Sequence, residues 1–218
     1  TSAGALIDPA QIIVQDTAVF SGTSIYLAGD PADVLNISGN VLLIASGGGS
    51  ITVAAAGTVT MGSVTFQTTG TVLISEDDGT LLTGSNTAGT LTLTSAATLT
   101  NTAASGLAVT GLARLTAPTI QLGLASGDTV NFGSLQLQST GSVTIVEDSS
   151  MNLVNTSTIG TLADLTATGT APDLTLTGTL QTTSGSILLQ ANRDVIFAAT
   201  GQLTSVSGNV AVTADAAG

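Results

Sequence analysis

Apolar residues along this chain alternate with polar ones in short bursts and rarely recur at the spacing of a helix. The bursts are rich in Val, Ile, Leu and Thr, and a Gly, Ser, Thr or Asn residue precedes most of them. A period of two with β-branched residues predicts β-strands, and the small residue before each burst predicts a turn. Typical bursts lie at residues 25–27, 51–53, 72–74, 91–93, 120–122, 143–145, 187–189 and 210–212. We therefore expect an all-β protein.

The chain also repeats itself. Residues 57–64 match residues 128–135 at an offset of 71, and the match continues to the pairs Glu76-Asp77 and Glu147-Asp148. In a second match, at an offset of 95, residues 23–27 and 33–37 align with residues 118–122 and 128–132. The two offsets differ by 24, and 71 is close to three units of that length. Repeats of this length without helical patterning predict a solenoid, in which each coil contacts only its neighbours.

About three short strands fit into each 24-residue unit, so we predict a single-stranded parallel β-helix, or β-solenoid, of about nine coils. One apolar column, with steps of 21 to 25 residues, is expected to mark successive coils: Ile13, Leu35, Val59, Leu82, Leu107, Val130, Leu153, Leu174 and Ile196. At a strand spacing of about 4.8 Å, nine coils give a rod roughly 40 Å long. Nothing divides the chain into two domains, and we expect residues 1–218 to form one solenoid segment of a longer protein or assembly.

Charge and composition exclude several functions. Fourteen Asp and Glu residues stand against two basic residues, Arg114 and Arg193, and the formal net charge is -12. Nucleic acids and anionic membrane surfaces attract cationic side chains, so neither is an expected partner. No apolar run is longer than that of residues 41–45, which is far shorter than the about 20 residues of a membrane-spanning helix. Because Cys and His are absent, the chain has no thiolate nucleophile, no thiol or imidazole metal ligand and none of the usual proton shuttles at neutral pH.

The acidic residues are the remaining candidates for chemistry. Glu76, Asp77 and Asp78 form one cluster, and Glu147 and Asp148 form another at the equivalent corner three coils later. Three coils place the clusters about 14 Å apart, beyond the roughly 5 to 9.5 Å that separates catalytic carboxylates, so we expect neither catalysis nor an organic cofactor here. Oxygen ligands at a corner suit calcium, which makes these five residues a candidate metal site. The alternative is a solvated, charged turn that blocks sideways strand pairing.

Residues 39–48, 184–196 and 207–215 share a pattern in which Gly with Ser or Asn precedes an alternating apolar run. In this pattern they resemble repeats of the filamentous-haemagglutinin-like family of large bacterial exoproteins. Residues 132–148 also resemble repeats of giant bacterial surface proteins. The resemblance implies a right-handed parallel β-helix outside the cell or on its surface. The export-recognition segment of such proteins carries Asn-Pro motifs, and this chain has none, so the resemblance is to the stalk.

Together these observations predict a non-catalytic structural protein, a stalk or repeat segment of a secreted or cell-surface bacterial adhesin or fibre. Its expected partners are other solenoid segments of the same protein or identical subunits, and the ligand or host surface stays open. The alternative is an extracellular filament subunit that stacks end to end, since the open ends of a solenoid expose unpaired backbone groups. A β-helical enzyme acting on polysaccharides is the third alternative.

Overall fold

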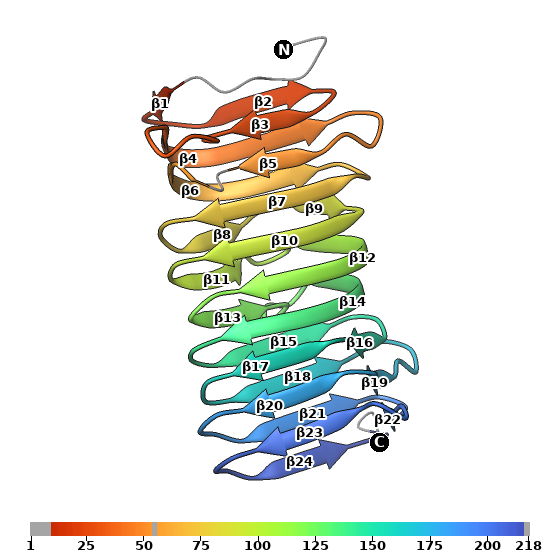
Figure 1. The fold of residues 1–218 in the computed structure, drawn as a ribbon. Helices are drawn as coiled ribbons and strands as arrows, with labels where there is room; N and C mark the ends of the chain where they lie inside the picture. Colours follow the sequence, from red (N-terminus) through yellow and green to blue (C-terminus); the bar gives the residue numbers. More distant parts are fainter. Residues whose placement is uncertain (1–9, 54–55, 216–218) are drawn as a thin grey trace.

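The structure is a computed structural model that describes residues 10–53 and 56–215. Within them the chain forms strands and turns that stack in about nine coils, with β1 and β24 at opposite ends of the rod (Figure 1). Neighbouring coils pair through parallel ladders, as in β1–β4 and β21–β24. The predicted all-β parallel solenoid is therefore confirmed. The described part of the chain contains no helix able to cross a membrane.

The strands are β1 (Gln11–Val14), β2 (Ala18–Gly22), β3 (Ile25–Leu27), β4 (Val34–Ala45), β5 (Ile51–Val53), β6 (Thr58–Gln67), β7 (Thr71–Glu76), β8 (Thr80–Leu82), β9 (Ser85–Ala88), β10 (Thr90–Ser95), β11 (Thr98–Asn101), β12 (Gly106–Thr116), β13 (Thr119–Leu122), β14 (Thr129–Ser139), β15 (Val143–Glu147), β16 (Met151–Leu153), β17 (Thr156–Ile159), β18 (Ala163–Ala167), β19 (Leu174–Leu176), β20 (Thr179–Thr182), β21 (Ile187–Ala191), β22 (Val195–Phe197), β23 (Gln202–Ser205) and β24 (Val210–Thr213).

The core is a column of apolar side chains along the axis of the rod. Alternate residues of each strand point inward, so in β15 Val143 and Ile145 are fully buried while Thr144 between them is partly exposed. The same alternation continues through the coils from Ile25 to Ala191. Because each inward side chain rests on side chains of the coils before and after it, the stack is stabilised by burial of about 1.5–3 kcal/mol for each large apolar residue.

Four strands, β4, β6, β12 and β14, are long because each crosses a bend and covers two faces of the rod. The register of their ladders shifts at the bend, between Ile37 and Asn40 in the β4–β6 pair and between Val109 and Leu112 in the β12–β14 pair. Gly133 lies at this bend in β14, where an added Cβ atom would be 2.1 Å from the carbonyl oxygen of the coil before. Only glycine permits so close an approach of two backbones.

The coils differ in length, and those that contain the acidic clusters are short, with Val143 of the second cluster's coil pairing with Ala163 at an offset of 20. Val34 pairs with Thr58, at an offset of 24, whereas Thr71 pairs with Thr90, at an offset of only 19. Among the described strands, the first half of β6 pairs only with β4, and the first half of β14 pairs only with β12. The other edge of each of these halves, at the short coil, has no strand partner. We call residues 76–86 the first step and residues 147–157 the second step.

Beyond each step, two short strands follow the second half of the long strand. At the first step, Val64 and Gln67 of β6 pair with β8 and β9, respectively. At the second, Leu135 and Gln138 of β14 pair with β16 and β17. The next pair of long strands, β12 and β14, therefore covers the following two faces of the rod. The second half of β14 pairs with that of β12, which pairs with β10, and β10 in turn pairs with β7.

The predicted apolar column is wrong in register at several coils. Leu35 stacks on Ile12 and not on Ile13, whose side chain is 54% exposed. Leu82 pairs with Asn101 and not with Leu107. A repeat unit of constant length cannot identify which residues stack beyond a step. The coil at the step is shorter, so the residue one unit later lies on a different strand from the one that actually pairs.

Candidate functional site

At the first step, acidic side chains occupy the edge of β6 that a neighbouring strand covers elsewhere. Glu76 ends β7, and its Oε1 accepts a hydrogen bond from the Met61 N–H at 2.9 Å. Asp77 Oδ2 accepts one from the Val59 N–H at 2.7 Å, and the Asp77 N–H donates to the Val59 carbonyl at 2.9 Å. These bonds satisfy backbone groups of β6 that a neighbouring strand would otherwise pair. The carboxylates therefore protect an internal strand edge.

The second step, related to the first by the offset of 71 found in the sequence, has the same geometry. Glu147 Oε1 accepts a hydrogen bond from the Phe132 N–H at 2.8 Å, and Asp148 Oδ1 accepts one from the Val130 N–H at 3.0 Å. The Asp148 N–H donates to the Val130 carbonyl at 3.1 Å. The repeat detected in the sequence thus corresponds to a repeated structural arrangement, in which acidic side chains bind the N–H groups of a strand edge where the sheet on one face of the rod ends.

Two further residues belong to the steps, and they were not predicted. Asn86 is 1% exposed, and its Oδ1 accepts a hydrogen bond from the Phe66 N–H at 3.0 Å, where β6 passes from β8 to β9. At the second step Ser157 Oγ accepts one from the Leu137 N–H at 2.9 Å. Both pairs are related by the offset of 71, but Asn86 and Ser157 differ in type and lie beyond the end of the sequence match, so the match did not reveal them.

The two glutamates are buried, which changes their chemistry. Glu76 is 2% exposed and Glu147 0%, whereas Asp77 and Asp148 are exposed. Burial, the largest cause, raises the pKa of each glutamate from 4.5 to about 8, although the backbone N–H that each accepts lowers the pKa. Both carboxyl groups are therefore mainly protonated at neutral pH. The prediction of a solvated turn holds for the aspartates and is wrong for the glutamates.

The second oxygen of each glutamate is also distinctive, because it is buried without a hydrogen-bond partner. Around Glu76 the charged neighbour is Asp78, whose negative charge raises the glutamate's pKa further. The equivalent of Asp78 at the second step is Ser149, whose hydroxyl donates to Glu147 Oε1 at 3.1 Å. At both steps the glutamate thus binds a backbone N–H group, but its neighbour is an aspartate at the first step and a serine at the second.

The structure brings together only part of the predicted calcium site. Among the described residues, no three carboxylate, His or Cys side chains are grouped so that they could hold a metal ion. Asp78 lines a hollow of about 200 Å³ beside the first step, but the corresponding hollow at the second step, about 310 Å³, is lined by no acidic residue. Calcium at Glu76, Asp77, Asp78, Glu147 and Asp148 stays a prediction. Four of these carboxyl groups, all but that of Asp78, bind backbone N–H groups and so have a structural role without calcium.

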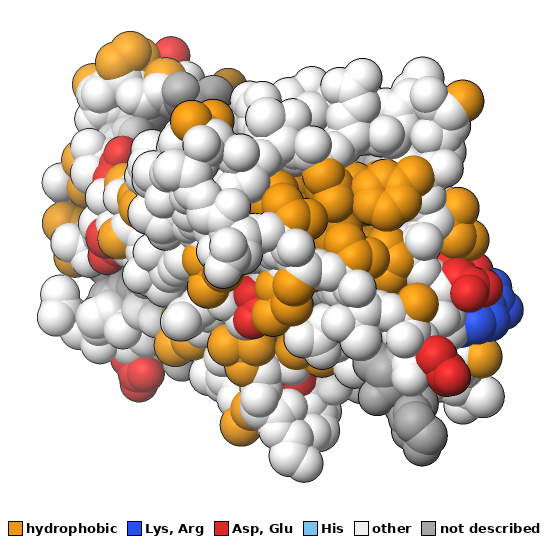
Figure 2. All heavy atoms as spheres, turned by 90° about the horizontal axis from the view of Figure 1, so that it is seen from below, with side chains coloured by type: hydrophobic (Ala, Val, Ile, Leu, Met, Phe, Trp, Pro, Cys, Tyr) orange, Lys and Arg blue, Asp and Glu red, His pale blue; other side chains and the backbone are white. Residues whose placement is uncertain are grey.

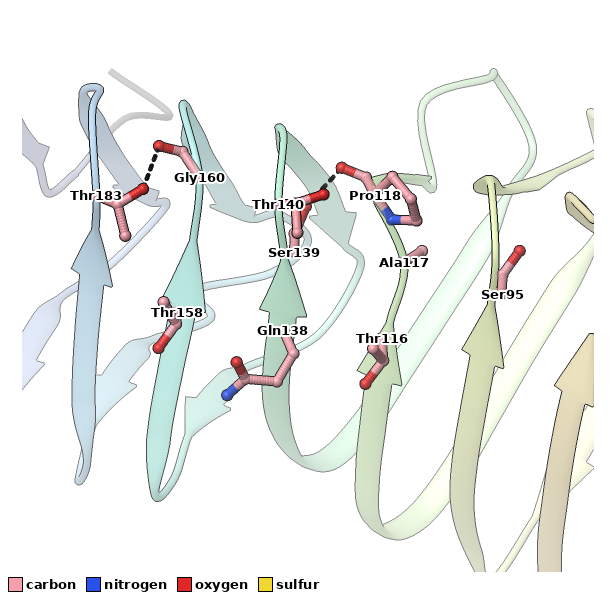
Figure 3. A pocket seen from close by; sticks show the side chains of 10 residues that line it. All are labelled: Ser95, Thr116, Ala117, Pro118, Gln138, Ser139, Thr140, Thr158, Gly160 and Thr183. Carbon is pink, nitrogen blue, oxygen red and sulfur yellow. Dashed lines mark hydrogen bonds between the residues drawn. The ribbon is translucent and has the colours of Figure 1, made fainter. Parts of the chain in front are cut away.

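A larger groove, about 420 Å³, follows one corner of successive coils (Figure 3). It is lined by Ser95, Thr116, Ala117, Pro118, Gln138, Ser139, Thr140, Thr158, Gly160 and Thr183. Some of its hydroxyl groups already bond across coils, since Ser139 donates to the Pro118 carbonyl at 2.8 Å and Thr183 to the Gly160 carbonyl at 2.9 Å. The groove is lined by no charged or aromatic residue, and the hydroxyl groups of Ser139 and Thr183 bind carbonyl groups of neighbouring coils.

No protein-family model, curated protein or solved structure matches this chain. The resemblance to filamentous-haemagglutinin-like repeats therefore stays a prediction that rests on the sequence patterns alone.

Proposed function

We propose that this chain is a structural segment of a secreted or cell-surface bacterial adhesin or fibre, and that its role is to hold its two ends apart. The observation that carries this proposal is the continuous parallel ladder from β1 to β24 with one buried core inside it. Bending such a rod would separate hydrogen-bonded coils and open the core at the same time. A stack of this kind is therefore suited to serve as a stiff spacer.

The use of the charged residues supports a non-catalytic role. The buried glutamates bind backbone N–H groups of the long strands. Of the two basic residues, Arg193 forms an ion pair with Asp173 across neighbouring coils, and Arg114 donates to the Gln136 side chain at 3.1 Å. Each of these groups thus has a partner that strengthens the contact between coils. None needs a substrate to explain its position.

The location can be tested on the cells that produce the protein. An antibody raised against the folded chain should label intact cells or their medium as strongly as permeabilised cells. Labelling that requires permeabilisation would refute the extracellular assignment. As a control, an antibody against a cytoplasmic protein should label only permeabilised cells.

The structural role has a separate test. Small-angle scattering at low protein concentration should give the profile of a single rod, of roughly 40 Å for nine coils. Amide hydrogen exchange should be slowest in the ladders of the middle coils, β10 to β15. A compact sphere, or exchange that is uniformly fast, would contradict the proposal, and so would release of sugar fragments from a panel of acidic polysaccharides.

A further inference from the structure

The two steps are the places where the ladder between neighbouring coils is weakest. Before the first step, β4 pairs with β6 along both halves of the two strands. At the step, β6 pairs with the strands after it only at Val64 and Gln67. In the same way β12 pairs with β14 along both halves, whereas β14 pairs with β16 and β17 only at Leu135, Gln138 and Ser139. Each step therefore interrupts the ladder over both halves of a long strand.

Side chains replace only part of the interrupted ladder. At the second step, Glu147 and Ser157 accept hydrogen bonds from the N–H groups of Phe132 and Leu137, respectively. The second carboxyl oxygen of Glu147, like that of Glu76 at the first step, is buried without a hydrogen-bond partner. Water that enters an opened step hydrates this oxygen and so removes the cost of its burial. Opening a step is therefore less costly than opening a continuous ladder.

The core keeps each step closed when no load acts on the rod. Val64 and Leu82 pair across the first step, Leu135 and Leu153 pair across the second, and all four side chains are buried. Figure 2 shows the rod from below, where apolar side chains gather on the end that no further described coil covers. Separating two coils would uncover a similar apolar layer, at a cost that grows with its area. The steps are therefore closed at rest.

One ladder crosses each step without interruption. At the first step β7 pairs with β10 along its whole length, and at the second β15 pairs with β18 along its whole length. The β7–β10 ladder continues into the second halves of β12 and β14, whereas the β15–β18 ladder continues from β11 and β13. These two ladders therefore lie on different faces of the rod.

We infer that the two steps are yield points of the rod, at which neighbouring coils separate first under load. Opening turns the coils about the uninterrupted ladder, β7–β10 at the first step and β15–β18 at the second, so the rod bends in a different direction at each step. Such opening is local and leaves the other coils folded. The use of the yield points rests on the proposed structural role, because a spacer between two attachment points carries load.

Amide hydrogen exchange of the complete chain, measured residue by residue by NMR, tests the inference without load. The N–H groups of Phe132 and Leu137 border the second step, and their matched controls are those of Val109 and Leu115, which pair with them one coil earlier. All four side chains are at most 5% exposed. Relative to their intrinsic rates, the step amides should exchange about tenfold faster than the controls, because local opening exposes them without unfolding the rest.

A disulfide across the step tests whether separation of the coils causes this difference. The chain contains no Cys, so Gln138→Cys with Thr158→Cys introduces one bond between paired residues on the two sides of the second step. The matched control is Thr116→Cys with Gln138→Cys, which joins paired residues one coil earlier, where the ladder is continuous. Neighbouring strands lie about 4.8 Å apart, within the range of Cα separations in disulfides. Circular dichroism verifies that both variants remain folded.

The disulfide across the step should slow the exchange of the Phe132 and Leu137 amides to the rates of their controls, and the control disulfide should leave the difference in place. Stretching single molecules from their ends should show two early ruptures before the main unfolding of the unmodified chain. The disulfide across the second step should remove one of these ruptures, and the control disulfide should remove neither.

Slow and equal exchange of the step amides and their controls would overturn the inference, although the proposed structural role would stand. Faster exchange at the step that both disulfides change to the same extent would also overturn it, because the amides would then open without separation of the coils. Uniformly fast exchange throughout the chain would overturn both the yield points and the structural role.

Discussion

Replacing Glu147 by Gln tests whether a protonated carboxyl group closes the second step. Gln keeps the oxygen that accepts the Phe132 N–H, and it has nearly the same shape, but it cannot ionise. Its amide group takes the position of the glutamate oxygen that is buried without a partner. An unsatisfied buried donor costs about 1–3 kcal/mol, and the protonated glutamate already carries a similar cost. At low pH the variant should therefore be about as stable as the unmodified chain.

The difference should emerge as the pH rises. In the folded chain the pKa of Glu147 is raised from 4.5 to about 8, so between these values the unfolded chain releases a proton that the folded chain keeps. The free energy of unfolding then falls as the pH increases, because the folded state binds more protons. Since a difference of one in pKa corresponds to about 1.4 kcal/mol, the loss for this group approaches roughly 5 kcal/mol above pH 8. The stabilising contribution of the protonated group is fully present below pH 4.5.

The assay is denaturant unfolding followed by circular dichroism at pH 5, 7 and 9. Glu147→Gln should lose less stability between pH 5 and pH 9 than the unmodified chain, and combining it with Glu76→Gln should flatten the dependence further. Asp16→Asn, at an exposed position in the first coil, serves as the control for a change in net charge. If the unmodified chain were equally stable at pH 5 and 9, or if the variant kept the same slope, the assignment of a neutral buried glutamate would be wrong.

Three further predictions concern the steps and the bends. Gly133→Ala should lower the free energy of unfolding by about 1–3 kcal/mol because its Cβ would meet a backbone carbonyl at 2.1 Å, whereas Gly106→Ala, whose nearest neighbour is a hydroxyl at 3.1 Å, should cost less in the same denaturation assay. Deleting residues 58–128, one full repeat of 71, should leave a folded rod about 14 Å shorter by scattering, whereas deleting residues 58–117 should disrupt folding. Calcium should leave the melting temperature unchanged, and a rise that Asp78→Ser abolishes would instead support the calcium prediction.

The strands and the class of fold could be predicted because they depend on local alternation. Residues 72–74 and 143–145, for example, lie in β7 and β15 as expected. The number of coils followed from the average repeat length, since an average over the chain tolerates coils of unequal length. The register of the core did not follow, because the short and the long coils can be distinguished only when strands are paired in space.

The acidic site illustrates the same limit. The sequence located the repeated pairs, and the expectation of a solvated corner came from the usual behaviour of charged residues in turns. Yet Glu76 continues the inward alternation of Val72 and Ile74, and Glu147 continues that of Val143 and Ile145. This signal predicts burial. No local pattern indicates that a strand is missing beside β6 and β14. Its absence leaves the N–H groups of Met61 and Phe132 without a strand partner, and these groups donate to the buried carboxyl groups.

The long strands β12 and β14 lie on a different pair of faces from β4 and β6. One 71-residue repeat therefore adds a rotation about the rod axis as well as a length. Inserting or removing one repeat would turn everything beyond it about the axis by one of the three faces, while the ladder itself stays intact. Three repeats would bring a surface feature back into line. In a chain built on this plan, the number of repeats between two parts of the molecule could therefore set the relative direction in which those parts point.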